Sequence, residues 1–186
     1  LDRFAAGRFD PGWRTTSDVS IAASYGLAVG TLLLDGGLEG ASDLVVVAES
    51  ILLSNAVGAL VNLGARRPRP LAYGTAAPDD ERLRGNTSLS FFSGHTAGAF
   101  AAALSTYATL RRRHPDSLLP YVALGVGITA ASFIGTTRVL AGDHFPTDVV
   151  AGALVGSALG LLVPALHDSP VQVSASGAGV ALALEL

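Results

Sequence analysis

The chain has 186 residues, of which 49% are hydrophobic and only 15% are charged, and its formal net charge at pH 7 is −3. An ordinary soluble domain carries about 25% charged residues, so this composition and a mean hydropathy of +0.47 indicate a membrane protein or an unusually apolar helical bundle. The negative charge argues against a nucleic-acid partner, and the lack of cysteine excludes a disulfide framework and a thiolate metal site.

Five apolar segments are each long enough for a helix rather than a strand. In chain order they cover residues 19–34, 44–63, 96–110, 118–137 and 149–166. Only the fourth and fifth are uncharged runs that are long enough to cross a bilayer comfortably. Asp43 and Glu49 flank or interrupt the second segment, so we expect them to face protein rather than lipid. The sequence therefore predicts an all-α fold, a helical bundle of about five long helices.

The connections between these segments contain the polar residues. Residues 35–43 (DGGLEGASD) predict a turn followed by an N-cap at Ser42 or Asp43. Residues 66–88 form a long polar loop whose prolines end the second helix. Residues 111–117 (RRRHPDS) are interpreted as a solvated or positive-inside loop without chemistry.

The predicted domain organisation is a helical domain over residues 1–168 and a C-terminal tail over 169–186. The tail alternates weakly between apolar and polar residues, and we assign it no structure or role. The chain starts at Leu1 rather than at a methionine, so we expect a preceding segment, such as a signal or a first span.

If consecutive helices run antiparallel, the polar residues of three motifs collect on one face of the bundle, whereas RRRH lies on the other. These residues are Arg67, Arg69, Ser93, His95, Arg138, His144 and Asp148. Taken singly, each motif has a simpler interpretation. Residues 66–70 (RRPRP) fit a solvated loop, and residues 93–95 (SGH) fit a helix cap. Residues 142–148 (GDHFPTD) fit a turn before a helix that starts with proline. Their convergence on one face favours a functional site.

Such a set of residues is suited to phosphoryl transfer. Arginine forks beside a helix N-terminus at Ser93 and Gly94 would bind a tetrahedral anion. Asp148 follows His144 by four residues, the spacing that places both on one side of a helical turn, where the carboxylate could fix the imidazole tautomer. His144 would then be a nucleophile and His95 a general acid. No metal and no cofactor are predicted.

The third motif resembles the last part of the pattern of the type 2 phosphatidic acid phosphatase family, which includes bacterial acid phosphatases and vanadium haloperoxidases. That part reads Ser-Arg, five residues, His, three residues, Asp. Here Thr137 and Arg138 are followed after five residues by His144 and after three more by Asp148. Only the serine is replaced, and every spacing is kept.

The other two parts of the family pattern, Lys-x6-Arg-Pro and Pro-Ser-Gly-His, precede it in order. Residues 92–95 read FSGH, with Phe in place of Pro, and Arg69 stands before Pro70. Asn62 occupies the position of the family's lysine. The chain therefore resembles this family from about residue 62 to residue 166.

The resemblance implies that His144 is the nucleophile, Asp148 its partner and His95 the acid. It also implies a phosphate-binding set made of Arg69, Arg138, Ser93 and Gly94. Asn62 can donate a hydrogen bond but brings no charge, and we hypothesise that Arg67 supplies the missing cation. Membrane members of the family usually have six spans, so five helices fit the loss of the first one.

The sequence thus predicts a metal-independent phosphatase or phosphotransferase that acts through a phosphohistidine on a phosphomonoester or diphosphate, and the apolar helices favour a lipid-linked substrate. The expected partners are this substrate and the membrane, with the site facing the periplasm or exterior because the arginine-rich loop would stay cytoplasmic. A soluble periplasmic bundle is the alternative location. The alternative functions are a vanadate-dependent haloperoxidase and a non-catalytic membrane module that binds phospholipid headgroups.

Overall fold

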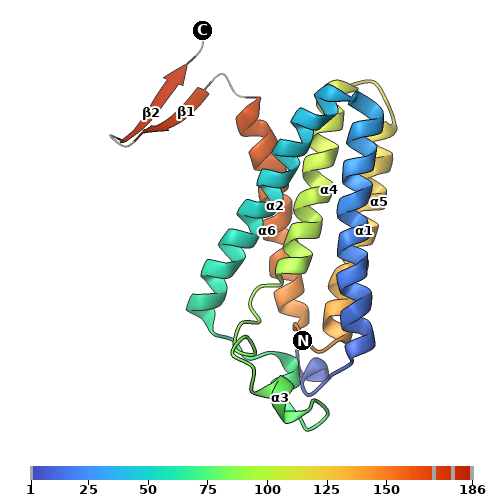
Figure 1. Ribbon diagram of the computed structural model, residues 1–186, viewed down its shortest axis with the longest axis vertical. Coiled ribbons are helices and arrows are strands. Elements are labelled where there is room, and N and C mark those ends of the chain that lie inside the picture. The colour runs from blue at the N-terminus through green and yellow to red at the C-terminus, as the bar shows by residue number, and fades with distance from the viewer. Residues whose placement is uncertain (1, 169–170, 177–178, 185–186) are drawn as a thin grey trace.

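The computed structural model describes residues 2–168, 171–176 and 179–184. Five long helices run alternately up and down, as the all-α prediction requires (Figure 1). Their bounds are Pro11–Gly36 (α1), Leu38–Ala65 (α2), Gly94–Arg113 (α4), Leu119–Leu140 (α5) and Pro146–His167 (α6). Shorter turns precede α1 at Arg3–Ala5 and interrupt the α2–α4 connection at Pro70–Tyr73 and at Asp79–Arg82 (α3).

The first helix starts earlier than its apolar segment. Pro11 occupies the first turn, and the side chain of Asp10 accepts hydrogen bonds from the backbone N–H groups of Gly12 and Trp13. This combination is a strong helix start, because an aspartate N-cap and an N1 proline satisfy or remove the donors that a helix leaves unpaired. It adds two turns before Val19 that are not apolar and that carry polar side chains.

The second helix also starts earlier than the sequence indicates. It begins at Leu38, directly after Gly37, whose φ of +52° is easily adopted by glycine. The predicted N-cap at Ser42 or Asp43 is therefore wrong. Asp43 lies inside α2, where its buried carboxylate contacts the end of α4.

The arginines predicted to lie in a solvated connection form the last turn of α4, and two of them are extensively ion-paired. Arg112 binds Asp43 at 2.6 Å and also contacts Asp168, while Arg113 binds Asp35 at 3.1 Å and also contacts Asp43. These pairs tie the α1–α2 turn and the end of α6 to α4 at the end of the bundle away from the long loop.

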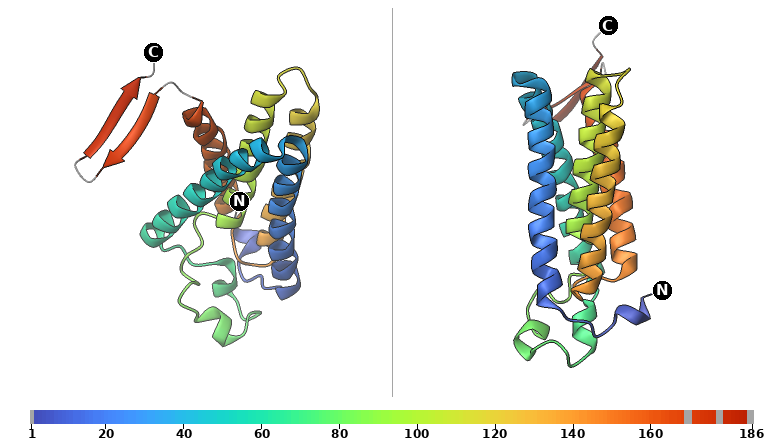
Figure 2. Two further views of the ribbon diagram at one scale, coloured as in Figure 1. Left: turned by 45° about the horizontal axis from the view of Figure 1, so that its top comes forward. Right: turned by 90° about the vertical axis from the view of Figure 1, so that its right-hand side faces the viewer.

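Helix α4 is the centre of the bundle and contacts α1, α2, α5 and α6 (Figures 1 and 2). Its contact with α6 is close because Gly152, Gly156 and Gly160 recur every fourth residue on α6. A Cβ at Gly156 would lie 2.1 Å from the carbonyl oxygen of Ala97, and one at Gly160 would lie 2.7 Å from that of Ala101. Small residues at this spacing allow two helix backbones to approach each other.

Four helical segments are long and apolar enough to cross a membrane, namely Pro11–Gly36, Gly40–Tyr73, Leu119–Leu140 and Pro146–His167. The sequence prediction of only two comfortable spans is therefore too low. It required an uncharged run, whereas Asp43 is accommodated inside α2 by the arginines of α4. Large exposed apolar side chains cover these segments, as expected where lipid is the solvent. The helices support a membrane location for the protein.

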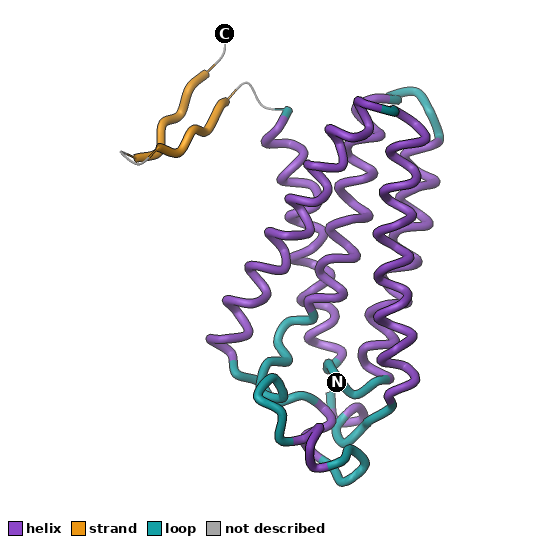
Figure 3. Tube along the Cα trace, in the orientation of Figure 1, coloured by secondary structure: helices purple, strands orange, loops and turns teal. Residues whose placement is uncertain are grey.

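The up-and-down order brings the loops around the polar end of the bundle together (Figure 3). The start of α1, the end of α2, the start of α4, the end of α5 and the start of α6 all meet there, beside the 66–93 connection (Figures 1 and 2). This arrangement confirms the antiparallel order on which the predicted site depends.

In the predicted tail, Val171–Ser176 (β1) and Gly179–Leu184 (β2) pair as antiparallel strands, with Val171 opposite Leu184. Residues 169–170, 177–178 and 185–186 lie outside the described part of the chain. The division into a helical domain over 1–168 and a tail stays a prediction.

Candidate active site

His144 lies in the short connection between α5 and α6, and its side chain is almost completely buried. Its Nδ1 lies 2.7 Å from the carbonyl oxygen of Ser90. A carbonyl only accepts hydrogen bonds, so Nδ1 carries the proton and Nε2 keeps its lone pair. Burial lowers the pKa of His144 well below its ordinary value of 6.5, and the charges of Arg138 and Arg69 lower it further. The imidazole is therefore neutral and can act as a nucleophile.

Asp148, in the first turn of α6, is fully buried and organises the segment around His144. Its Oδ2 accepts hydrogen bonds from the Ser90 hydroxyl at 2.5 Å and from the Phe145 backbone N–H at 2.8 Å. The same oxygen lies 3.9 Å from His144 Nδ1, too far for a hydrogen bond. Ser90 thus connects the two residues, because its carbonyl binds the imidazole and its hydroxyl binds the carboxylate. The sequence did not single out Ser90, which is one of several serines in its loop.

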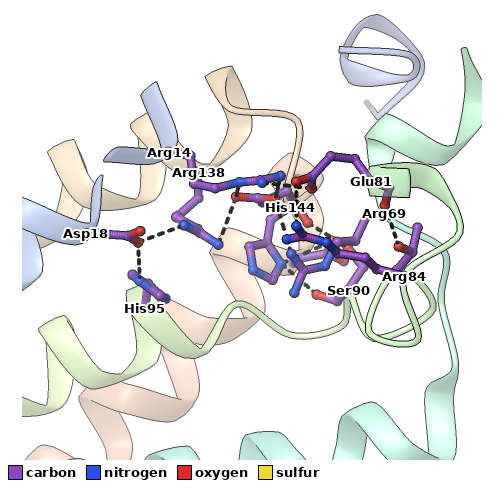
Figure 4. A network of polar contacts seen from close by, with 12 residues as sticks. Arg14, Asp18, Arg69, Glu81, Arg84, Ser90, His95, Arg138 and His144 are labelled. Carbon is purple, nitrogen blue, oxygen red and sulfur yellow. Dashed lines mark hydrogen bonds and ion pairs between the residues drawn. The ribbon is translucent and has the colours of Figure 1, made fainter. Parts of the chain in front are cut away.

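His95, in the first turn of α4, has an acidic partner that lies far away in the sequence. Its Nε2 is 2.9 Å from Oδ1 of Asp18 on α1, which also accepts a hydrogen bond from Arg138 Nη1 at 3.2 Å (Figure 4). Burial and the charge of Arg138 lower the pKa of His95 below its ordinary value, and the Asp18 carboxylate only partly offsets them in favour of the imidazolium form that a general acid requires. The sequence analysis gave His95 no such partner.

Three arginines surround one buried carboxylate next to His144 (Figure 4). Asp143 accepts from Arg14 at 3.1 and 2.9 Å, from Arg69 at 3.1 Å and from Arg138 at 2.9 Å. Burial alone raises the pKa of Asp143, but the charges of Arg138, Arg14 and Arg69 outweigh it and hold the pKa below 3.8. The carboxylate is therefore ionised at neutral pH.

A polar pocket of about 300 Å³ lies at the loop end of the bundle, and His95 lines it together with the arginines. His144, Asp143 and Asp148 are buried and do not line it. Its charged lining consists of Arg14, Arg69, Arg84, Arg138, Asp18 and Glu81, together with His95. The side chains come from α1, α4, α5 and the 66–93 connection, so the pocket exists only when these elements are packed together.

Two further predicted residues form the N-terminus of α4. Ser93 is its N-cap, and its hydroxyl accepts from the Thr96 hydroxyl at 2.9 Å and from the Thr96 backbone N–H at 3.4 Å. Gly94 is the first helical residue. The positive end of the α4 dipole is thus directed toward the loop region that holds the site.

The last two predicted phosphate-binding residues are placed differently. Arg67 donates to Asp148 at 2.5 Å and to Asp2 at 2.6 Å, and neither it nor Asn62 lines the pocket. The Asn62 amide donates to the Phe92 carbonyl at 3.5 Å, while its own oxygen is buried and has no partner among the described residues. This geometry contradicts the expectation that Arg67 supplies a cation to the phosphate.

The fold and the site together define an apolar helical bundle with a cationic, histidine-containing pocket at one end. The sequence profile of the PAP2 superfamily matches residues 43–170, more than two thirds of the chain. The chain belongs to the PAP2 superfamily. The matched region contains every predicted site residue but neither Arg14 nor Asp18.

Relatives of known name share part of the chain. It is 35% identical over 112 residues to a lipid A 1-phosphatase from Porphyromonas gingivalis, covering 60% of this chain and 23% of the relative. Lipid A 1-phosphatases from Rhizobium johnstonii and Rhizobium etli are 33% and 32% identical over 111 and 116 residues. These matches cover 56% and 59% of this chain and 41% and 45% of the relatives. The chain therefore spans less than half the length of each relative.

Among solved structures, the first transmembrane PAP2-type phosphatidylglycerolphosphate phosphatase, from Bacillus subtilis, is similar with a TM-score of 0.49 and 22% identity. The match covers 83% of this chain and 86% of that one. The roles of the individual site residues stay predictions.

Proposed function

We propose that this protein is a phosphatase that hydrolyses a phosphorylated membrane lipid through a phosphohistidine at His144. The single observation that carries the proposal is the buried imidazole itself. Ser90 holds its Nδ1, so that Nε2 is unprotonated, beside a pocket with several guanidinium groups. A nucleophile next to concentrated positive charge is what phosphoryl transfer from an anionic ester needs.

In the proposed reaction, Nε2 of His144 attacks phosphorus and the bond from phosphorus to the ester oxygen breaks. His95 donates a proton to the departing oxygen, which leaves as an alcohol. A water molecule then transfers a proton to His95 and attacks the phosphohistidine, which breaks the P–N bond and releases inorganic phosphate. Arg69 and Arg138 would stabilise the negative charge on the phosphoryl oxygens in both steps.

The proposed substrate class is a lipid phosphomonoester, with lipid A 1-phosphate as a first candidate. The relatives in Porphyromonas and Rhizobium are named for that activity. The pocket lies at one end of four helices that are apolar enough to span a membrane, which is where the headgroup of a lipid would be.

The proposed orientation places the site on the periplasmic or outer side. Arg111, Arg112 and Arg113 end α4 at the opposite end of the bundle, and short arginine-rich connections are retained in the cytoplasm. A single cysteine in place of Ser117 is expected to react with a membrane-impermeant reagent only after the membrane is opened. Labelling in intact cells would reverse the orientation.

The deciding experiment is a phosphate-release screen with purified protein over lipid A, phosphatidate, prenyl diphosphates and soluble phosphate esters. His144→Ala is expected to lower turnover by several orders of magnitude, as the loss of a nucleophile does. His167→Ala, at the other end of α6, is the matched control and is expected to keep activity. Acid-quenched protein should carry acid-labile phosphate that His144→Ala lacks.

Two outcomes would overturn the proposal. Near-normal turnover by His144→Ala would exclude the phosphohistidine. Bromide oxidation with added vanadate, without phosphate release from any ester, would identify a haloperoxidase instead.

A further inference from the structure

Arg14 is a pocket residue that lies outside all three sequence motifs. It is one turn into α1, and its side chain is 22% exposed. Nε and Nη2 bind the two carboxylate oxygens of Asp143, and Nη1 binds Glu81 at 3.0 Å. The paired contact fixes the guanidinium plane, because a bidentate arginine–carboxylate pair allows little rotation. Arg14 is therefore held in place at the pocket wall.

The carboxylate that holds Arg14 is the same one that Arg69 and Arg138 contact. Glu81 and Asp18 also pair with Arg14 and Arg138, so the four arginines at the pocket exceed the three carboxylates that hold them by one positive charge. Like charges gathered around one carboxylate repel one another. Asp143, Glu81 and Asp18 offset the repulsion, and the positive charge that remains suits a phosphate anion.

Two donors in the cluster have no acceptor. The Nε atoms of Arg69 and Arg138 are buried and make no hydrogen bond within residues 2–168, and Arg138 is only 5% exposed. A buried donor without an acceptor is costly, so such groups indicate where a ligand binds. An oxyanion with several oxygen atoms could accept from both while also contacting Arg14.

The positions that the sequence suggested for the third cation do not provide one to the pocket. Asn62 is neutral and its amide reaches the Phe92 carbonyl, whereas Arg67 binds Asp148 and Asp2. We propose that Arg14 is the third phosphate-binding cation, delivered by α1 in place of a lysine at position 62. This inference rests on the proposed function, because its ligand is the phosphoryl group of the substrate.

The test measures the binding of inorganic phosphate to purified protein by isothermal titration calorimetry at pH 7.5, which does not depend on turnover. Arg14→Gln is expected to raise the phosphate Kd at least tenfold, which corresponds to about 1.4 kcal/mol. Arg14→Lys, which keeps the charge but cannot form the fork, is expected to raise it at least threefold. Arg8→Gln is the control, since Arg8 stacks on Phe4 outside the pocket and its loss should leave the Kd unchanged.

A phosphate Kd within twofold of the unaltered protein's, in whichever of the two Arg14 variants folds, overturns the inference. Failure of the proposed function is a different result. It would be seen as turnover that persists in His144→Ala. The phosphate Kd of the Arg14 variants would still test the role of Arg14 in phosphate binding.

Discussion

Removal of the Arg67 side chain is expected to destabilise the fold much more than it weakens phosphate binding. Arg67 donates to the fully buried carboxylate of Asp148 at 2.5 Å and to Asp2 at 2.6 Å. Its guanidinium also lies 4.3 Å from the centre of the Phe145 ring. These contacts join the 66–93 connection, the start of α6 and the N-terminal segment, but none of them is in the pocket.

The expected loss follows from these three contacts. A charge-assisted hydrogen bond to a buried carboxylate contributes about 1.5–3 kcal/mol, and a partly exposed cation–π contact about 0.5–1 kcal/mol. Ser90 and the Phe145 backbone still donate to Asp148, so the carboxylate keeps two partners and the loss stays below that of an unpaired buried charge. We expect Arg67→Ala to lower the free energy of unfolding by about 3 kcal/mol, or the Tm by about 6–12 °C for a chain of this length.

The assay is thermal unfolding in detergent at pH 7.5, followed by circular dichroism, with the phosphate Kd measured on the same preparations. Arg66→Ala is the matched control, because Arg66 is exposed and its side chain donates only to the Leu63 carbonyl within the described residues. An unchanged Tm in Arg67→Ala together with a tenfold weaker phosphate Kd would refute this reasoning and return Arg67 to the phosphate site.

Three further outcomes are expected. Asp43→Asn should lower the free energy of unfolding by about 2 kcal/mol, because Arg112 and Arg113 lose a buried partner; an unfolding midpoint equal to that of the unaltered protein would contradict this. Since burial holds the pKa of His144 below 6.5, the unfolded chain binds its proton more readily, so stability is complete above about pH 6.5 and falls below it. Unfolding scans from pH 7.5 to 5 should show this decline, and a smaller one in His144→Gln; an equal decline in both proteins would be evidence against it. Finally, Asn62→Lys in the Arg14→Gln background should recover at least threefold of the lost phosphate affinity by titration, whereas no recovery would mean that position 62 does not reach the pocket.

The bundle and the convergence of the three motifs could be predicted because both depend on local patterns. Apolar segments of helix length fix the long helices, and their antiparallel order alone brings the start of α4, the end of α5 and the start of α6 to one end. The four-residue spacing predicted that Asp148 binds the imidazole of His144, but the two groups lie 3.9 Å apart and the Ser90 carbonyl binds Nδ1 instead. The spacing gave their proximity but not the bridging role of Ser90, which lies 54 residues before His144.

The partners supplied by α1 could not be predicted from such patterns. Arg14 contacts Asp143 across 129 residues of sequence, and Asp18 contacts His95 across 77. Both lie in turns that precede the apolar part of their helix. The Asp10–Pro11 pair was a readable signal for the earlier start, since it combines an N-cap with an N1 proline. Asp143 was not predicted as a site residue for another reason. It is one of the five residues between Arg138 and His144, and the third motif specifies only the number of residues there.

The far end of the bundle illustrates the same limit. Basic residues in a short connection usually are solvated, and composition alone gave no reason to pair them with Asp35 and Asp43. The packing supplies that reason, because a Cβ at Gly36 would lie 1.5 Å from the Arg113 guanidinium. A side chain at this position would require the Arg113 guanidinium to move from the place in which it contacts both carboxylates.

The three carboxylates nearest the two histidines have separate partners, which explains why the proposed anion site contains so many acids. Asp148 fixes the Ser90 loop that holds His144, Asp18 accepts from His95, and Asp143 gathers the arginines. Had these acids been absent, the guanidinium groups would repel one another and the histidines would lack fixed orientations. Because Asp143 contacts three arginines at once, their guanidinium groups are held in place before a ligand arrives. Charges that are fixed in place before the reaction stabilise a phosphoryl group most strongly in the state in which it carries the most negative charge, which is the transition state.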